Sequence, residues 1–249
     1  MKQDDKGYNC EKVLPYEKEE GKKEQIRDMF DSIANHYDTM NRTMSLGVDI
    51  SWRRKAVLKL KKYAPNTILD VATGTGDFAI DAYQILHPEK IVGIDLSEKM
   101  LTVGREKINN IGLSSVIDLE QADSLALTFD TATYDAVTVA FGVRNFENLA
   151  KGISEMQRVL KIGGQLLILE MAEPKGIIKP FYAVYSKVII PVIARFFSKD
   201  IKAYRYLPNS IKAFPKENEI KTLLYSCGFS RVEYSDFTFG ICSCYLAVK

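Results

Sequence analysis

The chain is 249 residues long and 46% hydrophobic, and 34 Lys and Arg against 32 Asp and Glu give it a formal net charge of +2. This length supports one large α/β domain or two small ones, and the near balance of charge excludes nucleic acid as a bulk electrostatic partner. The four cysteines form no CxxC pair and the two histidines stand apart from them, so we predict no metal site.

No segment has the roughly 20 uncharged apolar residues that a membrane span requires, and the N-terminus lacks the apolar core of a signal peptide. We therefore expect a cytoplasmic protein. The first 20 residues are rich in Lys, Glu and Asp, which predicts a flexible, solvated tail ahead of a single domain over 21–249.

Residues 22–63 are predicted to be helical and to form a cap on that domain. The stretch 52–63 has apolar residues at helical spacing, surrounded by basic residues that include Arg53, Arg54, Lys55, Lys59 and Lys62. Such a basic face is usually only solvated, and it also fits contact with anionic lipid.

From residue 67 onward, short β-branched runs alternate with amphipathic helical segments. The predicted strands are 67–72, 90–96, 116–122, 134–140 and 163–171, followed by 229–237 and 241–249. Alternation of strand and helix implies parallel pairing through right-handed crossovers. The last two runs are too close for a crossover helix and should pair as a hairpin. The predicted fold class is a Rossmann-like, doubly wound α/β fold with a mostly parallel seven-stranded sheet and an antiparallel C-terminal hairpin.

The first predicted strand runs into a glycine loop. Gly74 and Gly76 allow the backbone to turn tightly and approach a ligand, beside the free N–H groups of the following helix. Asp95 ends the second strand 21 positions after Gly74, where a carboxylate can accept both hydroxyls of a ribose. This pattern predicts a nucleotide-type site, and both NAD and S-adenosyl-L-methionine fit it.

Three features favour S-adenosyl-L-methionine. Asp70 and Asp77 flank the loop, and an acidic rim suits a cationic sulfonium and ammonium better than a pyrophosphate. The third strand ends in QADS at 121–124, where a carboxylate and a hydroxyl could read an adenine amino group, although Asp123 alone also fits a helix N-cap. The Tyr-x-x-x-Lys spacing of short-chain dehydrogenases occurs only in the tail and the last strand.

The chain resembles the menaquinone and ubiquinone biosynthesis C-methyltransferases. The matching stretches cover nearly everything after the tail: 29–54, 70–77, 141–145, 155–170, 204–215 and 227–249. YDTMNRTMSLG at 37–47 and FGVRN at 141–145 are far more specific to the family than the glycine loop. The resemblance implies a class I methyltransferase fold and methyl transfer from S-adenosyl-L-methionine to a ring carbon of a prenylated quinol, a reaction that requires no metal.

Carried over by position, the resemblance places cofactor contacts on Thr75, Asp95, Asp123 and Ser124; with Gly74 and Gly76 of the glycine loop, these are the predicted cofactor-binding residues. Ala140 departs from the family pattern, because many members have a serine there.

Arg144 is the predicted catalytic residue. It follows the strand 134–140 at the carboxyl edge of the sheet, where its guanidinium could stabilise a quinol oxyanion or hold a proton-accepting water. The alternative is that Arg144 pairs with a carboxylate and only pins its loop. Tyr37, Asn41 and Asn145 are predicted to line the substrate pocket. His36 is weighed as a base against a structural role, which is commoner for a lone histidine on a helix.

The stretch 176–197 is too apolar for an ordinary surface helix, yet its charged residues and Pro191 prevent it from spanning a bilayer. It fits either a packed core helix or a kinked lid, within a 176–215 insertion, that guides the prenyl chain and touches the inner membrane face. The acceptor stays open between a prenylated naphthoquinol and a prenylated benzoquinol. The further alternative functions are an NAD-dependent oxidoreductase and a non-catalytic quinone-binding scaffold. A homodimer is one possible oligomeric state.

Overall fold

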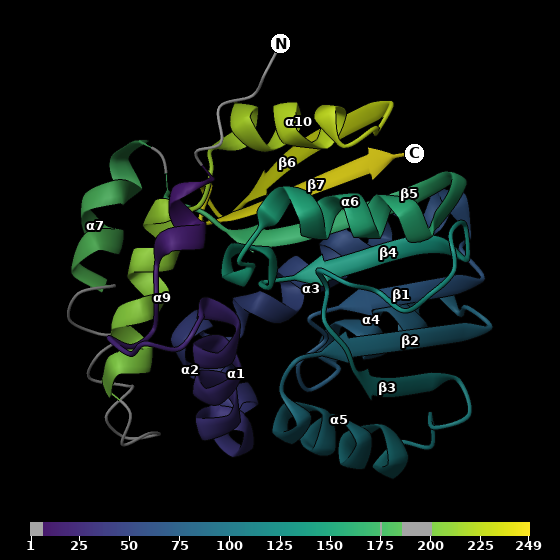
Figure 1. The fold of residues 1–249 in the computed structure, drawn as a ribbon, viewed down its shortest axis with the longest axis horizontal. Coiled ribbons are helices and arrows are strands. Elements are labelled where there is room, and N and C mark those ends of the chain that lie inside the picture. The colour runs from purple at the N-terminus through teal and green to yellow at the C-terminus, as the bar shows by residue number, and fades with distance from the viewer. Residues whose placement is uncertain (1–6, 175, 186–200) are drawn as a thin grey trace.

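Seven strands form one sheet in the order β3-β2-β1-β4-β5-β7-β6, in a computed structural model that describes residues 7–174, 176–185 and 201–249 (Figure 1). The strands are β1 (Thr67–Val71), β2 (Lys90–Asp95), β3 (Ile117–Gln121), β4 (Tyr134–Ala140), β5 (Leu160–Met171), β6 (Arg231–Phe237) and β7 (Cys242–Val248). The first five pair in parallel, and β7 lies antiparallel between β5 and β6. All seven predicted strands and the C-terminal hairpin are confirmed.

Helices of the described residues cover both faces of the sheet and its carboxyl edge. The α-helices are α1 (Lys22–Ile33), α2 (Tyr37–Ser45), α3 (Val48–Leu58), α4 (Asp77–Leu86), α5 (Glu98–Asn110), α6 (Leu149–Val159), α7 (Lys179–Val184), α9 (Ile201–Ala213) and α10 (Glu217–Ser226). The 3-10 turns are η1 (Asn9–Lys12), η2 (Ala34–His36), η3 (Lys61–Tyr63), η4 (Val143–Asn145) and η5 (Gly176–Ile178). Local side chains fix several starts. The Ser97 hydroxyl accepts the Met100 N–H of α5, and the Asn148 amide oxygen accepts the Lys151 N–H of α6.

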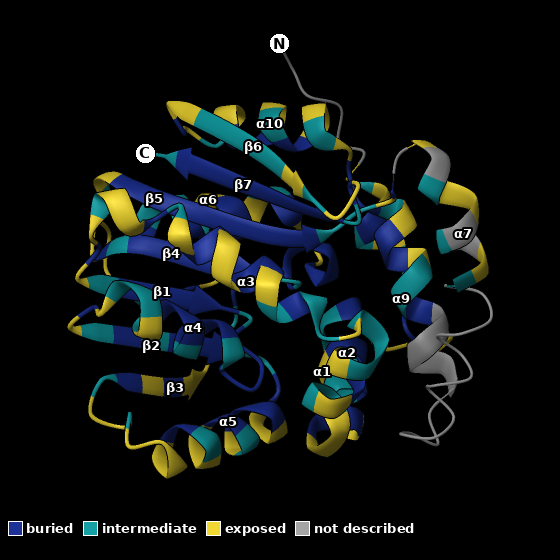
Figure 2. Cartoon of the chain, turned by 180° about the vertical axis from the view of Figure 1, so that it is seen from behind, coloured by how far each residue is buried: buried dark blue, intermediate teal, exposed yellow. Residues whose placement is uncertain are grey.

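Two hydrophobic clusters hold the helices against the sheet. Because side chains alternate along a strand, Ile68 of β1 joins the cluster under α3, α4 and α5, and Leu69 joins the one under α6 and α10. Figure 2 shows the central strands buried beneath these helices. The two-residue spacing of Cys242 and Cys244 places both thiols in the first cluster, as free, buried cysteines.

The carboxyl ends of the parallel strands meet at one edge of the sheet, and α1, α2, α7 and α9 lie beside that edge (Figure 1). In open α/β sheets this edge is where ligands bind. The residues 22–63 are helical as predicted, because α1, η2, α2, α3 and η3 lie in that range.

Part of the predicted solvated tail is packed instead. Cys10 in η1 is fully buried, and the Lys22 ammonium donates to its carbonyl oxygen at 2.6 Å. The prediction is wrong for this turn because one apolar side chain and one buried hydrogen bond are enough to dock it against α1 and η4. Residues 1–6 lie outside the described residues.

The apolar stretch 176–197 is described only in part. Its first helix, α7, is short and carries the exposed Val184, whereas Lys187, Pro191 and Arg195 lie outside the described residues. Among the residues that the structure describes, no helix has the length and apolar character needed to cross a membrane.

Candidate active site

The glycine loop connects β1 to α4 and has the conformation that its sequence demands. Gly74 and Gly76 have φ of 57° and 80°, in the left-handed region that favours glycine. A Cβ on Gly74 would also lie 3.2 Å from the Met100 side chain, a tight contact that glycine avoids. Gly76 immediately precedes α4 and makes the turn into it.

Asp95 holds the glycine loop against the end of β2. Its two carboxylate oxygens accept the N–H groups of Gly74 and Ser97, each at 2.9 Å. Burial raises the pKa of Asp95, although these backbone hydrogen bonds oppose the shift. Each oxygen keeps a further lone pair, so the carboxylate can still accept the hydroxyls of a ribose.

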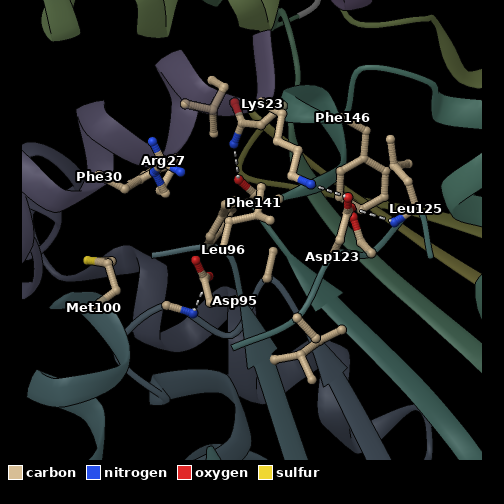
Figure 3. A pocket seen from close by; sticks show the side chains of 18 of the residues that line it. Lys23, Arg27, Phe30, Asp95, Leu96, Met100, Asp123, Leu125, Phe141 and Phe146 are labelled. Carbon is tan, nitrogen blue, oxygen red and sulfur yellow. Dashed lines mark hydrogen bonds and ion pairs between the residues drawn. The ribbon is translucent and has the colours of Figure 1, made fainter. Parts of the chain in front are cut away.

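Asp123 and Ser124 follow β3 on the same edge. One Asp123 oxygen accepts the Leu125 N–H at 2.8 Å, and the other pairs with the Lys23 ammonium of α1 at 2.7 Å. Asp123 therefore caps a turn. The alternative prediction of a helix N-cap at Asp123 is wrong, because no helix of the described residues begins there. Its ion pair also joins α1 to the strand end (Figure 3). Ser124 is buried beside it.

These residues border one cavity, which we call the loop cavity, of about 750 Å³ including its open mouth (Figure 3). Asp95, Asp123 and Ser124 supply polar groups to its wall, and Leu96 and Met100 supply apolar ones. Carboxylates for ribose hydroxyls, a polar strand end for a base edge and apolar surfaces for a base face suit a nucleoside. The chemistry of this wall therefore fits the adenosine part of S-adenosyl-L-methionine.

A second and larger cavity, the helical cavity, lies between α2, α3, α7 and α9, with about 1810 Å³ including its open mouth. Its apolar wall includes Met44, Trp52, Tyr182, Leu207 and Ile211. The described parts of the predicted 176–215 insertion thus contribute directly to this wall.

The two cavities share five lining residues: Tyr37, Ala72, Gly74, Ala140 and Phe141. They therefore meet at the first turn of α2, the glycine loop and the end of β4. Tyr37 and Asn41 both line the helical cavity, as predicted for a substrate pocket, whereas Asn145 lines the loop cavity. His36 is exposed and belongs to neither wall, so the structure gives it no position as a base.

Arg144 in η4 is 6% exposed and lines the helical cavity. Its Nη1 donates to Glu170 Oε1 and to the Phe141 carbonyl, both at 2.5 Å, and its backbone N–H donates to Glu170 Oε2 at 3.2 Å. The Nε atom is buried and has no hydrogen-bond partner among the described residues. Glu170 is therefore the carboxylate that the alternative prediction required to hold the loop. The same guanidinium still has one unused donor, its Nε–H group.

Asp70 lies beneath the loop and lines the helical cavity. Its oxygens accept the hydroxyls of Thr73 and Thr138, each at 2.6 Å. Burial raises the pKa of Asp70 to about 6, against the effect of both hydroxyls. A cationic ligand at the loop would favour the ionised carboxylate.

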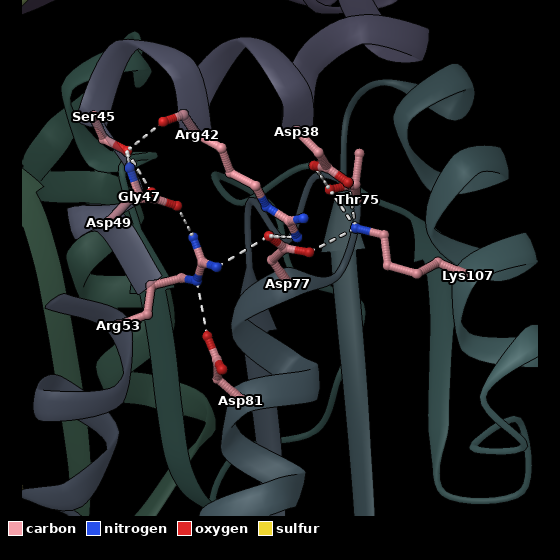
Figure 4. A network of polar contacts seen from close by, with 10 residues as sticks. All are labelled: Asp38, Arg42, Ser45, Gly47, Asp49, Arg53, Thr75, Asp77, Asp81 and Lys107. Atoms are coloured by element: carbon pink, nitrogen blue, oxygen red, sulfur yellow. Dashed lines mark hydrogen bonds and ion pairs between the residues drawn. The ribbon is translucent and has the colours of Figure 1, made fainter. Parts of the chain in front are cut away.

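A polar network joins α2, α3, α4 and α5 behind the loop (Figure 4). Its centre is Arg53, which pairs with three carboxylates at 2.7 to 3.1 Å: those of Asp49, Asp77 and Asp81. Arg53 is only 8% exposed, so the prediction of a solvated or lipid-facing basic helix is wrong for this residue.

Asp77 is part of the same network, where Lys107 contacts it at 2.6 Å. Although burial alone raises it, the pKa of Asp77 is lowered by Lys107 and Arg53. The prediction that Asp77 forms an acidic rim toward the cofactor is therefore wrong, because neighbouring cations neutralise it. Thr75 is 2% exposed, and its hydroxyl donates to Asp38 of α2 at 2.6 Å.

Sequence reasoning missed three residues that surround η4. Glu170 is the penultimate residue of β5 and pairs with Arg144. Lys22 begins α1 and donates to the carbonyls of Arg144 and Phe146, and Tyr206 of α9 contacts Asn145. Burial lowers the pKa of Lys22 to about 8. Glu170 and Tyr206 lie in the matching stretches 155–170 and 204–215, and that resemblance was the only sequence signal for them.

A glycine loop and acidic strand ends at the carboxyl edge of this sheet, with the helical cavity beside them, are the features of a class I methyltransferase. A S-adenosylmethionine-dependent methyltransferase from Aquifex aeolicus has the same fold, with a TM-score of 0.55 at 20% identity over 77% of this chain and 88% of that one. The ubiE/COQ5 methyltransferase family model matches residues 18–249, and the chain belongs to that family. The resemblance found in the sequence is confirmed.

Two relatives are similar over nearly their full length. The chain is 51% identical to the demethylmenaquinone methyltransferase of Bacteroides fragilis, over 97% of this chain and 99% of that protein. It is 44% identical to the ubiquinone/menaquinone biosynthesis C-methyltransferase UbiE of Geobacter sulfurreducens, over 92% of this chain and 90% of that protein.

Proposed function

We propose that this protein transfers the methyl group of S-adenosyl-L-methionine to a ring carbon of a prenylated demethylmenaquinol, giving the menaquinol. The observation that carries the proposal is the meeting of the loop cavity and the helical cavity at Tyr37, Ala140 and Phe141. One cavity suits a nucleoside, and the other suits an apolar acceptor with a polar ring. The identity of 51% with a demethylmenaquinone methyltransferase supports this choice of acceptor.

The cofactor supplies an electrophilic methyl group when bound. Asp95 would accept the ribose hydroxyls, and Asp123 with Ser124 would face the adenine. Gly74 and Gly76 would let the backbone approach, and Thr75, fixed by Asp38, would border the methionine part. Methyl transfer requires the ring carbon at roughly 3 to 3.5 Å from the methyl group, and two cavities that meet at one wall would let this chain's residues supply such positioning.

Arg144 would act on the acceptor. A quinol ring becomes a carbon nucleophile as its hydroxyl loses a proton, and the guanidinium in the wall of the helical cavity stabilises the negative charge that develops on that oxygen. Arginine remains charged and is a poor base, so a water held by the guanidinium would take the proton. Glu170 fixes the guanidinium through Nη1.

The 176–215 segment would form the lid of the helical cavity. Ile178, Tyr182 and Leu207 of its described parts lie in the apolar wall, where a prenyl chain would pack. We propose that this lid touches the inner membrane face, so that the long-tailed acceptor enters the cavity from the bilayer.

The test is methylation by the purified protein with isotopically labelled S-adenosylmethionine and mass analysis of the product. Chemically reduced demethylmenaquinone should gain one methyl group on its ring, whereas the oxidised quinone should not, because its ring is electron-poor. Absence of product from the reduced substrate would overturn the proposal. Preference for a prenylated benzoquinol, in a competition between the two quinols, would instead assign the ubiquinone branch, which the name of the Geobacter relative includes.

A further inference from the structure

Helix α9 overlaps the matching stretch 204–215, and its contacts reach the helical cavity and the η4 turn. Tyr206 is 4% exposed and packs against Ile26 and Met29 of α1. The next residue, Leu207, and Ile211 one turn later line the helical cavity. The same helix therefore contacts the cap, the acceptor wall and, through Tyr206, the η4 turn.

The Tyr206 hydroxyl donates to Asn145 Oδ1 at 2.9 Å, in a buried hydrogen bond between residues 61 positions apart. Burial raises the pKa of Tyr206, so the phenol stays protonated and remains a donor. Because this bond takes the acceptor end of the Asn145 amide, the amide nitrogen is turned the other way. That nitrogen lies 3.5 Å from the carbonyl oxygen of Phe141.

The Phe141 carbonyl also receives Nη1 of Arg144 at 2.5 Å. Phe141 lies on the shared wall of the two cavities and has a φ of 58°, a backbone conformation that is costly for a residue with a side chain. Such a conformation persists only where surrounding contacts hold it. Here the Asn145 amide and the Arg144 guanidinium both converge on its oxygen.

We propose that Tyr206 is a positioning residue for methyl transfer: it orients the Asn145 amide, which with the Phe141 carbonyl holds the Arg144 guanidinium toward the acceptor. This inference rests on the proposed function of Arg144 and adds a role for α9. Through Tyr206, α9 would also link the apolar wall of the helical cavity to Arg144, because Leu207 and Ile211 of the same helix line that cavity.

The first test is Tyr206→Phe, which removes one hydroxyl and keeps the ring against α1. We expect kcat to fall about tenfold, as one buried hydrogen bond permits, while KM for cofactor and quinol changes less than about threefold. The control is Tyr234→Phe, which removes a phenolic hydroxyl 3.2 Å from that of Ser243 in the terminal hairpin and should leave kcat unchanged. A wild-type kcat in Tyr206→Phe would overturn the proposal.

A double-mutant cycle identifies the route of the effect. If Tyr206 acts through the amide, then Tyr206→Phe should reduce kcat less than about twofold further in an Asn145→Ala background. Full additivity of the two losses would overturn the proposal, because Tyr206 would then act independently of Asn145.

A spectroscopic arm separates this inference from the proposed function. The side-chain amide signal of Asn145, assigned by its loss in Asn145→Ala, should shift in Tyr206→Phe and stay in place in Tyr234→Phe. An unchanged signal would overturn the positioning role whether or not the enzyme methylates demethylmenaquinol. A shifted signal in a protein that fails to methylate the reduced quinol would overturn only the proposed reaction.

Discussion

Two carboxylates of the loop cavity and the guanidinium of the helical cavity are held in different ways. Asp95 and Asp123 follow β2 and β3, and each is held by a backbone N–H two residues further on, from Ser97 and Leu125. Arg144, by contrast, depends on Glu170 of β5 and on Lys22 of α1, 122 positions away. The nucleoside side thus depends mainly on the strand ends, with Lys23 of α1 paired to Asp123, whereas Arg144 on the acceptor side depends on contacts from β5 and α1.

Arg144→Gln should produce the largest effect, because it removes the charge on which the acceptor side depends. We expect kcat with the reduced quinol to fall about 10²- to 10³-fold, with KM for the cofactor nearly unchanged. Steady-state kinetics at saturating cofactor would measure this. A loss confined to KM would show that the guanidinium only helps to bind the acceptor.

The same substitution leaves Glu170 buried without its partner, at a cost of about 3–5 kcal/mol in the free energy of unfolding. The double variant Arg144→Gln/Glu170→Gln removes both charges and should recover most of that stability while kcat stays low. If the double variant regained activity together with stability, Arg144 would be an anchor of the loop only.

Asp95→Asn should break the nucleoside side alone. The amide nitrogen cannot accept the N–H of Gly74 or a ribose hydroxyl, so we expect the Kd for S-adenosylmethionine to rise roughly 10- to 100-fold by calorimetric titration. The turnover number at saturating cofactor should change about twofold or less, because the acceptor side is intact.

The matched control for this variant is Asp118→Asn on β3, whose exposed carboxylate is 3.8 Å from Lys90. It should leave cofactor binding unchanged, since exposed ion pairs contribute little. A strong loss of kcat in Asp95→Asn would mean that the two sides are coupled more closely than their separate polar contacts indicate.

The same contrast decides what could be predicted from the sequence. The strands, the glycine loop, Asp95 and Asp123 were predictable because short β-branched apolar runs and fixed short spacings indicate them. The sequence indicated that Arg144 could pair with a carboxylate, but it did not identify Glu170 as that carboxylate. Its identity depends on how β4 and β5 come into register, which no local pattern reveals.

Two errors have the same origin. Asp77 was taken for a free carboxylate because the Arg53 and Lys107 side chains that neutralise it come from α3 and α5. Arg53 was taken for a solvated charge because its helical spacing does not show that three carboxylates surround it. Sequence periodicity does not show which charged side chains pair in the folded protein. Those ion pairs determine which acidic residues at the glycine loop remain available to a ligand.

Asp70 lies beneath the glycine loop and lines the helical cavity, and its titration gives the smallest expected effect. Its folded pKa of about 6 is above the ordinary value of 3.8, so the folded protein binds more protons than the unfolded chain between these pH values. The contribution of Asp70 to the free energy of unfolding therefore increases as pH falls from about 6 toward 3.8. Above pH 6 the carboxylate is ionised in both states, and its burial then destabilises the folded protein. Relative to Asp70→Asn, the wild-type protein should gain about 1 kcal/mol between pH 7.5 and pH 5 in denaturant titrations.

Cofactor binding should show the opposite trend with pH. An ionised Asp70 beneath the loop attracts a cationic ligand, so the affinity of the wild-type protein for S-adenosylmethionine should increase as pH rises through about 6. In Asp70→Asn this increase should be absent, whereas Asp118→Asn should keep it. An affinity that rises equally in Asp70→Asn would assign the titration to another group and would leave Asp70 as a structural acceptor for Thr73 and Thr138.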